Sequence, residues 1–246
     1  MQIFHRSMNT IAKVSIVGAV FFLAFLGWVA TALTSSSYAT GQYVVKHQPV
    51  PFSHEHHVRG LGIDCRYCHT SVERSATAGL PPTETCMNCH RQIWTNAELL
   101  EPIRASYRDN VPVQWNRVHD LPDYVYFNHS VHVAKGIGCA SCHGKVNEMP
   151  LMFQNASLQM EWCLSFHRDP AKNVRPREEV FNIDWNPGDP RTWTSVAANA
   201  RAMQVPVEVA SKQGWSPSST EVARLRPHLA QEYGIKSLTS CSTCHR

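Results

Sequence analysis

Nine cysteines stand in short motifs that each end in a histidine. Four of these motifs follow the pattern Cys-x-x-Cys-His, which places two thiols next to an imidazole. In this pattern the thiols can form thioethers with the vinyl groups of a haem, and the histidine becomes the proximal ligand of its iron. The four motifs are Cys65/Cys68/His69, Cys86/Cys89/His90, Cys139/Cys142/His143 and Cys241/Cys244/His245. The sequence therefore predicts four covalently bound haems.

A zinc site is the competing interpretation of the first two motifs. Seventeen residues separate Cys68 from Cys86, which is within the range of a four-cysteine zinc ribbon. A zinc ribbon needs no histidine after each cysteine pair, however, and the pair at Cys241 has no second pair nearby. The repeated histidine therefore favours haem.

A fifth, irregular motif keeps only one thiol. In Cys163-Leu-Ser-Phe166-His167 a phenylalanine takes the place of the second cysteine. An internal repeat explains this motif, because Phe-x-His-x-x-His-Val precedes both Cys65 and Cys139, and both copies continue to Glu-x-Cys-x-x-(Cys or Phe)-His-Arg. Phe166 aligns with Cys89, the second cysteine of the second motif in the first copy. We therefore expect a fifth haem, held by Cys163 through a single thioether and by His167 at its iron.

The sixth iron ligands are expected among the remaining histidines. The two Phe-x-His-x-x-His units resemble those of small multihaem class III cytochromes, in which the first histidine binds the haem of the next motif and the second binds another haem. This resemblance implies distal roles for His54 and His57 in the first unit and for His129 and His132 in the second. His119 is our candidate for the remaining iron, with Met149 or Met160 as alternatives.

Six-coordinate irons would leave no open position for a substrate, so the ligand supply predicts electron transfer and no catalytic residue. A multihaem enzyme is the alternative, since nitrite- and hydroxylamine-type enzymes keep one iron open. Those enzymes sometimes carry lysine in place of the motif histidine, and no Cys-x-x-Cys-Lys occurs in this sequence.

An apolar N-terminal segment predicts a membrane anchor. Residues 14–33 carry no charge, and as a helix they would reach about 30 Å, the thickness of the hydrocarbon core. They are preceded by Arg6, Lys13 and the α-amino group. Residues 1–13 should therefore be cytoplasmic, and the residues after the anchor should lie on the periplasmic side. A cleaved signal peptide is the alternative, with Ala30-Thr31-Ala32 as a passable site. The length of the apolar run favours a retained single-pass helix.

The remaining sequence is expected to form a mainly helical and irregular domain organised around five haems, at residues 51–246, after a polar linker at 34–50. The duplicated units cover about 51–91 and 122–168. A capping box at Thr95-x-x-Glu98 predicts a helix that is interrupted near Pro102, and a second helix is expected at 157–167. Residues 168–240 lack a haem motif and are rich in tryptophan and proline, so we expect an extended, wrapping segment before the last motif at 241–245. The charge of +4 comes from scattered residues, which gives no indication of nucleic-acid binding.

Taken together, the anchor, the paired Phe-x-His-x-x-His units, Val-His-Asp-Leu-Pro-Asp-Tyr-Val-Tyr-Phe at 118–127 and the terminal Cys-Ser-Thr-Cys-His-Arg resemble the pentahaem cytochrome c subunit of bacterial alternative complex III. The resemblance covers nearly the whole chain and departs from the family at Phe166, where the family pattern has cysteine. Related subunits accompany molybdopterin oxidoreductases.

This resemblance implies an electron-transfer subunit of a respiratory quinol:electron-acceptor oxidoreductase. It implies an iron–sulfur/molybdopterin-like subunit, polytopic quinol-oxidising membrane subunits and a monohaem cytochrome subunit as partners, and a soluble cytochrome or copper protein as acceptor. The alternative is a membrane-anchored quinol-dehydrogenase cytochrome that feeds a periplasmic or molybdopterin-type reductase.

Overall fold

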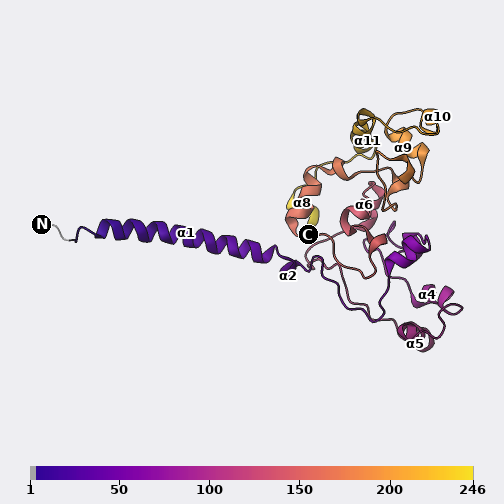
Figure 1. Ribbon diagram of the computed structural model, residues 1–246, viewed down its shortest axis with the longest axis horizontal. Coiled ribbons are helices and arrows are strands. Elements are labelled where there is room, and N and C mark those ends of the chain that lie inside the picture. Colours follow the sequence, from indigo (N-terminus) through magenta and orange to yellow (C-terminus); the bar gives the residue numbers. More distant parts are fainter. Residues whose placement is uncertain (1–3, 246) are drawn as a thin grey trace. The chain divides into compact units, whose positions relative to one another are not determined.

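The computed structural model describes residues 4–245, and it divides into two compact units with the boundary between Gln42 and Tyr43. The first unit contains α1 (Met8–Thr34) and the short α2 (Ser37–Thr40), which ends at Gly41 in the left-handed conformation (Figure 1). Helix α1 begins about a turn and a half before the uncharged run at 14–33, so it includes Lys13. Its length and composition suffice to cross a membrane, although a signal sequence would meet the same criterion. Residues 1–3, part of the expected cytoplasmic terminus, and Arg246 lie outside the described residues.

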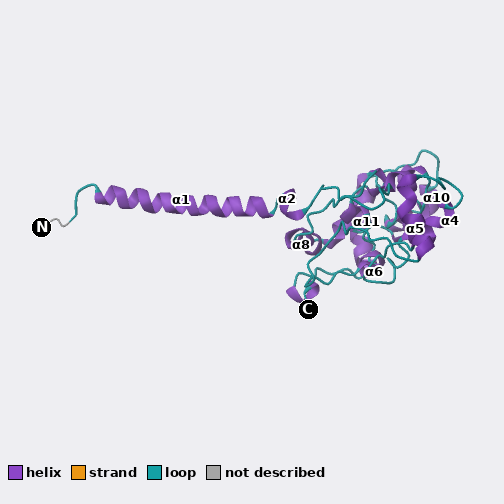
Figure 2. Ribbon diagram, turned by 90° about the horizontal axis from the view of Figure 1, so that it is seen from below, coloured by secondary structure: helices purple, strands orange, loops and turns teal. Residues whose placement is uncertain are grey.

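The second unit consists of short helices joined by long loops (Figure 2). Within the described residues, β-pairing is limited to two isolated bridges, between Val45 and Phe153 and between Ile137 and Val174. The helices of this unit are η1 (Glu55–Gly60), α3 (Cys65–Cys68), α4 (Thr83–His90), η2 (Glu98–Leu100), α5 (Glu101–Asp109), α6 (His129–Ala134), α7 (Ala140–His143), η3 (Val146–Glu148), α8 (Met160–Arg168), η4 (Pro170–Asn173), η5 (Arg177–Glu179), η6 (Pro190–Thr192), α9 (Val196–Ala202), α10 (Val207–Ala210), α11 (Ser219–Glu232) and α12 (Cys241–Cys244).

The residues expected to form the linker divide between the two units. From Tyr43 onward they are bonded to the second unit: the Tyr43 amide donates to the Gln154 carbonyl at 2.8 Å, and Val50 is buried with Leu100 and Ile103. Residues 46–48 also run beside residues 116–117, since Lys46 Nζ donates to the Arg117 carbonyl at 2.7 Å. Residues 43–50 therefore belong to the second unit, and a linker outside it is shorter than residues 34–50 predict.

The helix expected from the Thr95 capping box begins later than predicted. Glu98–Leu100 form a 3-10 turn, and α5 itself starts at Glu101. Pro102 lies in the first turn of α5, where a missing amide hydrogen costs no intrahelical bond, so it opens the helix and does not interrupt it. Helix α5 ends at Asn110, which adopts a left-handed conformation with φ of 53°. Helix α8 begins at Met160, three residues later than expected, and ends before Pro170 as predicted.

The segment at 168–240 has a packed core of its own, which corrects the expectation of an extended, wrapping chain. Val174, Met203 and Leu225 are fully enclosed, and Trp185 and Trp193 pack against them. Helices α9, α10 and α11 lie together at one end of the unit, while α4 and α5 lie together at the other (Figure 1). The tryptophans thus pack inside this segment, because α9, α11 and the residues beside them provide the apolar surface that a single extended chain would lack.

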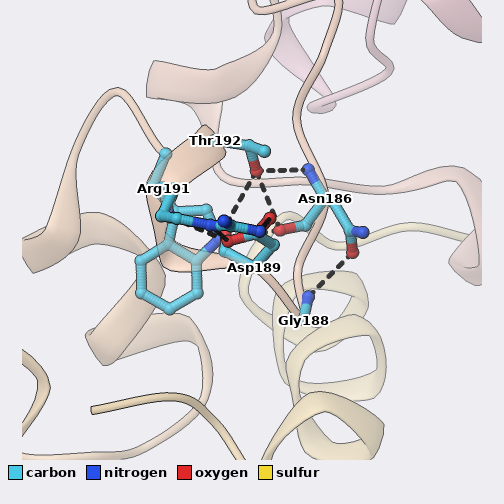
Figure 3. Close-up of polar contacts among 6 residues, drawn as sticks. Asn186, Gly188, Asp189, Arg191 and Thr192 are labelled. Atoms are coloured by element: carbon cyan, nitrogen blue, oxygen red, sulfur yellow. Dashed lines mark hydrogen bonds and ion pairs between the residues drawn. The ribbon is translucent and has the colours of Figure 1, made fainter. Parts of the chain in front are cut away.

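Residues 186–192 form a polar loop within this segment (Figure 3). The Thr192 hydroxyl accepts from the Asn186 amide at 2.9 Å, and Asn186 Oδ1 accepts from the Gly188 amide at 2.9 Å. Asp189 caps the following turn and pairs with Arg191 at 2.8 Å. These local bonds fix the shape of the loop, and the Asn182 side-chain amide ties it to the preceding segment by donating to the Thr192 carbonyl at 2.6 Å.

Leu225→Ala is expected to lower the free energy of unfolding by about 2–5 kcal/mol, because Leu225 is 0% exposed and its removal leaves a cavity. Leu238→Ala is the matched control, since Leu238 is 49% exposed and its loss should cost about 0.5 kcal/mol or less. Guanidinium unfolding followed by helical circular dichroism measures both. Equal effects of the two substitutions would contradict the packed core.

Candidate functional site

Four histidines at two short helices lie close to histidines of the cysteine motifs, and three of them form ring pairs. The ring centres of His57 and His90 are 6.3 Å apart, those of His132 and His167 are 6.2 Å apart, and those of His129 and His143 are 6.4 Å apart. His54 lies close enough to His69 for the two imidazoles to interact electrostatically. Helix η1 and the residue before it thus provide one pair of histidines, and α6 provides the other.

The separation of the ring centres tests whether an iron fits between the rings. An imidazole nitrogen sits about 2.0–2.1 Å from a bound metal, so two rings on opposite sides of one iron have centres about 6–6.5 Å apart once the ring radii are added. The three measured separations fall in this range. The side chains present therefore fit the haem ligand sets that the sequence predicts.

Hydrogen bonds to backbone carbonyls orient several of these rings. Nδ1 of His57 lies 2.8 Å from the Ser53 carbonyl, and Nδ1 of His132 lies 2.7 Å from the Asn128 carbonyl. A carbonyl can only accept, so Nδ1 must carry the proton and Nε2 keeps its lone pair. The same bond joins His69 to the Gly79 carbonyl, His129 to the Ala76 carbonyl and His245 to the Tyr124 carbonyl. Five rings therefore present Nε2 in the form that binds a metal.

The two repeats place their aromatic rings in nearly the same way. Phe52 stacks on His57 with centres 4.4 Å apart and a 24° angle, and Phe127 stacks on His132 at 4.5 Å and 25°. Each phenylalanine also meets the first histidine of its unit edge-on, at 87° and 88°. The second cysteine motif of each copy lies on a helix, α4 in the first copy and α8 in the second. This correspondence is the structural counterpart of the alignment of Phe166 with Cys89.

Burial keeps the most enclosed imidazoles neutral. It lowers the pKa of His54 to about 4, and the neighbouring His69 and His57 add to this shift. It also lowers the pKa of His119 to about 4, with further contributions from His129 and Lys46. Burial and the neighbouring His119 and His129 lower the pKa of His143 to about 3. Neutral imidazole is the form that binds iron, so these rings are available as ligands at neutral pH.

His119 lies against His143 in this structure. Its Nε2 is 3.2 Å from Nδ1 of His143, and the ring centres are 4.4 Å apart, which is too close for an iron between them. His119 is thus placed behind a motif histidine, and its predicted role at the remaining iron stays a prediction. Of the alternatives, Met149 is buried beside η1, whereas Met160 is 67% exposed at the start of α8.

The nine cysteines are all free thiols in the structure, and their neighbours define the order of the motifs. Burial raises the pKa of Cys86, and the nearby Cys68 adds to the rise. Burial raises the pKa of Cys139 to about 12 with Cys65 as the next cause, and that of Cys142 to about 11 with Cys163 as the next cause. Burial and then Cys244 raise the pKa of Cys163. Each motif is therefore adjacent to the next in the order 86/89, 65/68, 139/142, 163 and 241/244.

Hydrogen bonds join two of the neighbouring pairs of motifs in this order. The Asn88 amide donates to the Tyr67 hydroxyl at 3.1 Å, which links the first two motifs. The Ser237 hydroxyl donates to the His167 carbonyl at 2.8 Å, which ties the chain before the last motif to the fourth. A zinc ribbon would instead gather four thiols around one ion. Among residues 4–245, no group of three or more histidine, cysteine, aspartate or glutamate side chains is arranged to hold one metal ion.

The structure also contains site features that the sequence analysis missed. The carbonyls that orient the rings have no sequence signal, because every residue has one. The position of His119 behind His143 joins a loop to a motif, and neither the repeat nor the spacing contains that information. Arg175, which lies beside the third motif, belongs to the segment that was expected to carry no haem motif.

Comparison with known proteins adds one finding. No family model matches the chain. The chain is 34% identical over 128 residues to the multiheme cytochrome c subunit of menaquinone reductase from Nitratidesulfovibrio vulgaris. The matched region covers 52% of this chain and 56% of the relative, so the chain spans about half the length of the curated relative it matches. Over that region, the chain is similar to a multihaem cytochrome c subunit.

Proposed function

We propose that this chain is a membrane-anchored electron-transfer subunit that holds five c-type haems in a quinone-linked oxidoreductase. The observation that carries the proposal is the set of facing imidazoles, three pairs of which have the separation that one iron requires. The likeness to a multihaem cytochrome c subunit supports it independently. Bound at these sites, haem c accepts and releases one electron at its iron.

The chain's own residues attach and ligate these groups. The thioethers form on all nine motif cysteines, with Cys163 as the single tether of its site. The proximal ligands are His69, His90, His143, His167 and His245. The distal ligands in the first four sites are His54, His57, His129 and His132, respectively. This assignment uses the three histidine pairs whose ring centres are 6.2–6.4 Å apart and the neighbouring pair His54 and His69.

The last site takes its distal ligand from a loop or a methionine. The Tyr124 carbonyl orients His245, the proximal ligand of this site. Because His119 lies at His143, the distal ligand of this iron is either His119 after a shift of its loop or a methionine. Met160 is the better placed of the two methionines, because it lies on the same helix as Cys163, whose thiol is next to Cys244.

The order of the motifs supports a relay. Histidines three residues apart on one short helix serve two neighbouring sites, so η1 couples the first two motifs and α6 couples the third and fourth. The chain thereby holds its five attachment sites in one continuous row. Distal histidines at the first four irons exclude substrate from those irons. We propose that a ligand from this chain also fills the fifth position, so the chain has no catalytic role on its own.

We further propose that α1 is retained and spans the cytoplasmic membrane once. Arg6 and Lys13 precede its uncharged part, which favours a cytoplasmic N-terminus and a periplasmic haem domain. The proposed partners are an iron–sulfur/molybdopterin-like subunit, polytopic quinone-binding subunits and a monohaem cytochrome, with a soluble cytochrome or copper protein as acceptor.

Two directions of electron flow are open to such a subunit. The resemblance to the pentahaem subunit of alternative complex III supports oxidation of quinol and transfer outward. The likeness to a subunit of menaquinone reductase favours the reverse, with electrons delivered to the membrane quinone. Both directions use the same row of sites.

Purification of the tagged full-length chain from its native membranes tests the proposal. We expect five haem irons per chain, and polytopic and iron–sulfur subunits that co-purify with it. Menaquinol should reduce the haems of the intact complex if flow is outward, whereas a reduced periplasmic donor should drive menaquinone reduction if flow is inward. Zinc without iron would overturn the haem assignment. Quinol oxidation by the isolated chain would instead favour the quinol-dehydrogenase cytochrome.

A further inference from the structure

Arg175 is a buried cation that lies against the backbone just before the third cysteine motif. The residue is 8% exposed, and a Cβ on Gly138 would collide with its guanidinium carbon. The guanidinium also lies over the Trp185 ring, 4.9 Å from the ring centre. The absence of a side chain at Gly138 therefore allows the cation to lie next to Cys139.

Backbone carbonyls hold the guanidinium in this position. Nη1 donates to the Glu179 carbonyl at 3.3 Å and to the Asn182 carbonyl at 2.9 Å, while Nε is buried without a hydrogen-bond partner. The short segment between these carbonyls contacts two attachment cysteines. The Val180 carbonyl accepts from the Cys139 amide at 3.1 Å, and the Phe181 carbonyl lies 3.9 Å from Sγ of Cys65. Arg175 thus lies next to Cys139 and is bonded to the segment that contacts both Cys139 and Cys65.

Glu179 carries the counter-charge of Arg175, and its carboxylate is directed away from the cysteine motif. Glu179 is 0% exposed, and its carboxylate accepts from the Thr194 amide at 2.8 Å and the Ser195 amide at 2.9 Å. It also accepts from the side-chain amides of Asn199 at 2.6 Å and Asn182 at 2.8 Å. These donors fix the negative charge towards residues 194–199, whereas the positive charge faces Gly138 and Cys139. Arg175 is 8% exposed, so its cation is poorly solvated, and this burial lowers its pKa.

We propose that Arg175 is a fixed positive charge that raises the reduction potential of the haem attached to Cys139 and Cys142. This inference rests on the proposed haem sites. An iron centre gains one positive charge on oxidation, so a nearby cation disfavours the oxidised form, and a poorly solvated environment strengthens the effect. Because this motif is third of five, Arg175 raises the potential at the centre of the row.

The test is a redox titration of the haem-loaded complex, followed by visible and electron paramagnetic resonance spectra. Arg175→Met should move one of the five components to lower potential, by about tenfold in its equilibrium constant for reduction, or about 59 mV for one electron. Arg175→Lys should restore most of the shift, because it returns the charge. Arg191→Met is the matched control, since Arg191 is highly exposed and pairs with Asp189, and it should leave all five components unchanged.

Glu179→Gln provides a test with the opposite sign. Removal of the counter-charge should raise the potential of the same component, whereas a merely structural role would give shifts of one sign or none. Five bound haems with unchanged potentials in both variants would overturn this inference and leave the proposed function intact. Absence of haem from the unsubstituted chain would overturn the proposed function itself. If Arg175→Met loses haem, then Arg175→Lys and Glu179→Gln decide: a rise in the Gln variant alone supports the proposal, and unchanged potentials in both contradict it.

Discussion

Cys163→Ala is expected to release one haem from the denatured chain, whereas Cys89→Phe is expected to release none. Cys163 is the single thiol of its motif, so its removal leaves only iron coordination, which does not survive denaturation. Cys89→Phe reproduces the natural Cys-x-x-Phe-His pattern in the other repeat and keeps Cys86 as a tether. Intact-mass measurement under denaturing conditions counts the attached haems, and we expect four in the first variant and five in the second.

The reverse change completes the comparison. Phe166→Cys restores the full motif on α8 and should add a second thioether without changing the number of haems. The pyridine haemochrome spectrum reports this change, because a haem with one remaining vinyl group absorbs at longer wavelength than one with two thioethers. An unmodified Cys163 peptide in the unsubstituted protein would contradict the single tether and reduce the number of haems to four.

The alignment that supports this prediction could be made from the sequence because it depends on residue types that recur in order. Phenylalanine and two histidines at fixed spacing are followed by cysteine motifs at similar distances in both copies. The structure gives both copies the same ring stacking, to within 0.1 Å and 1° for Phe52 on His57 and Phe127 on His132. Local chemistry of this kind is repeated wherever the local sequence is repeated.

Features that depend on contacts between distant segments could not be predicted in this way. His119 occurs once, in a loop with no counterpart in the other repeat, so nothing in the pattern indicates that it meets His143. Arg175 meets Gly138 only after the chain has passed through α7 and α8. Its charge is typical of a surface residue, and its burial follows from tertiary packing alone.

The core at 168–240 was missed for a different physical reason. Tryptophans and prolines without clear periodicity suggested an extended chain, yet α9 buries Ala198, Ala200 and Ala202, which are nearly inaccessible to solvent. Small side chains allow close approach of neighbouring segments, and their contribution depends on partners elsewhere in the chain. Periodicity on one helix therefore underestimated a core that α9, α11 and two tryptophans share.

His57→Ala is expected to convert one of the five irons from low spin to high spin. The ring centre of His57 is 6.3 Å from that of His90, so its removal opens the distal side of one site. The ferrous form should then bind carbon monoxide at about one iron in five, whereas the unsubstituted chain should bind none at this site. Absorption and electron paramagnetic resonance spectra of the purified protein measure both changes.

His56→Ala is the matched control, because His56 is the preceding residue on the same helix but stacks on Trp94, 6.1 Å between ring centres. Its removal should leave every iron in the low-spin state. The comparison separates ligation from the mere loss of an imidazole, because both substitutions remove a ring from η1 and only His57 faces a motif histidine. Carbon monoxide binding in the His56 variant, or low-spin iron throughout the His57 variant, would contradict the assignment of η1 to the second motif. A high-spin iron in the unsubstituted protein would also change the functional conclusion, because one distal position would then be free for substrate and the chain would be a candidate enzyme.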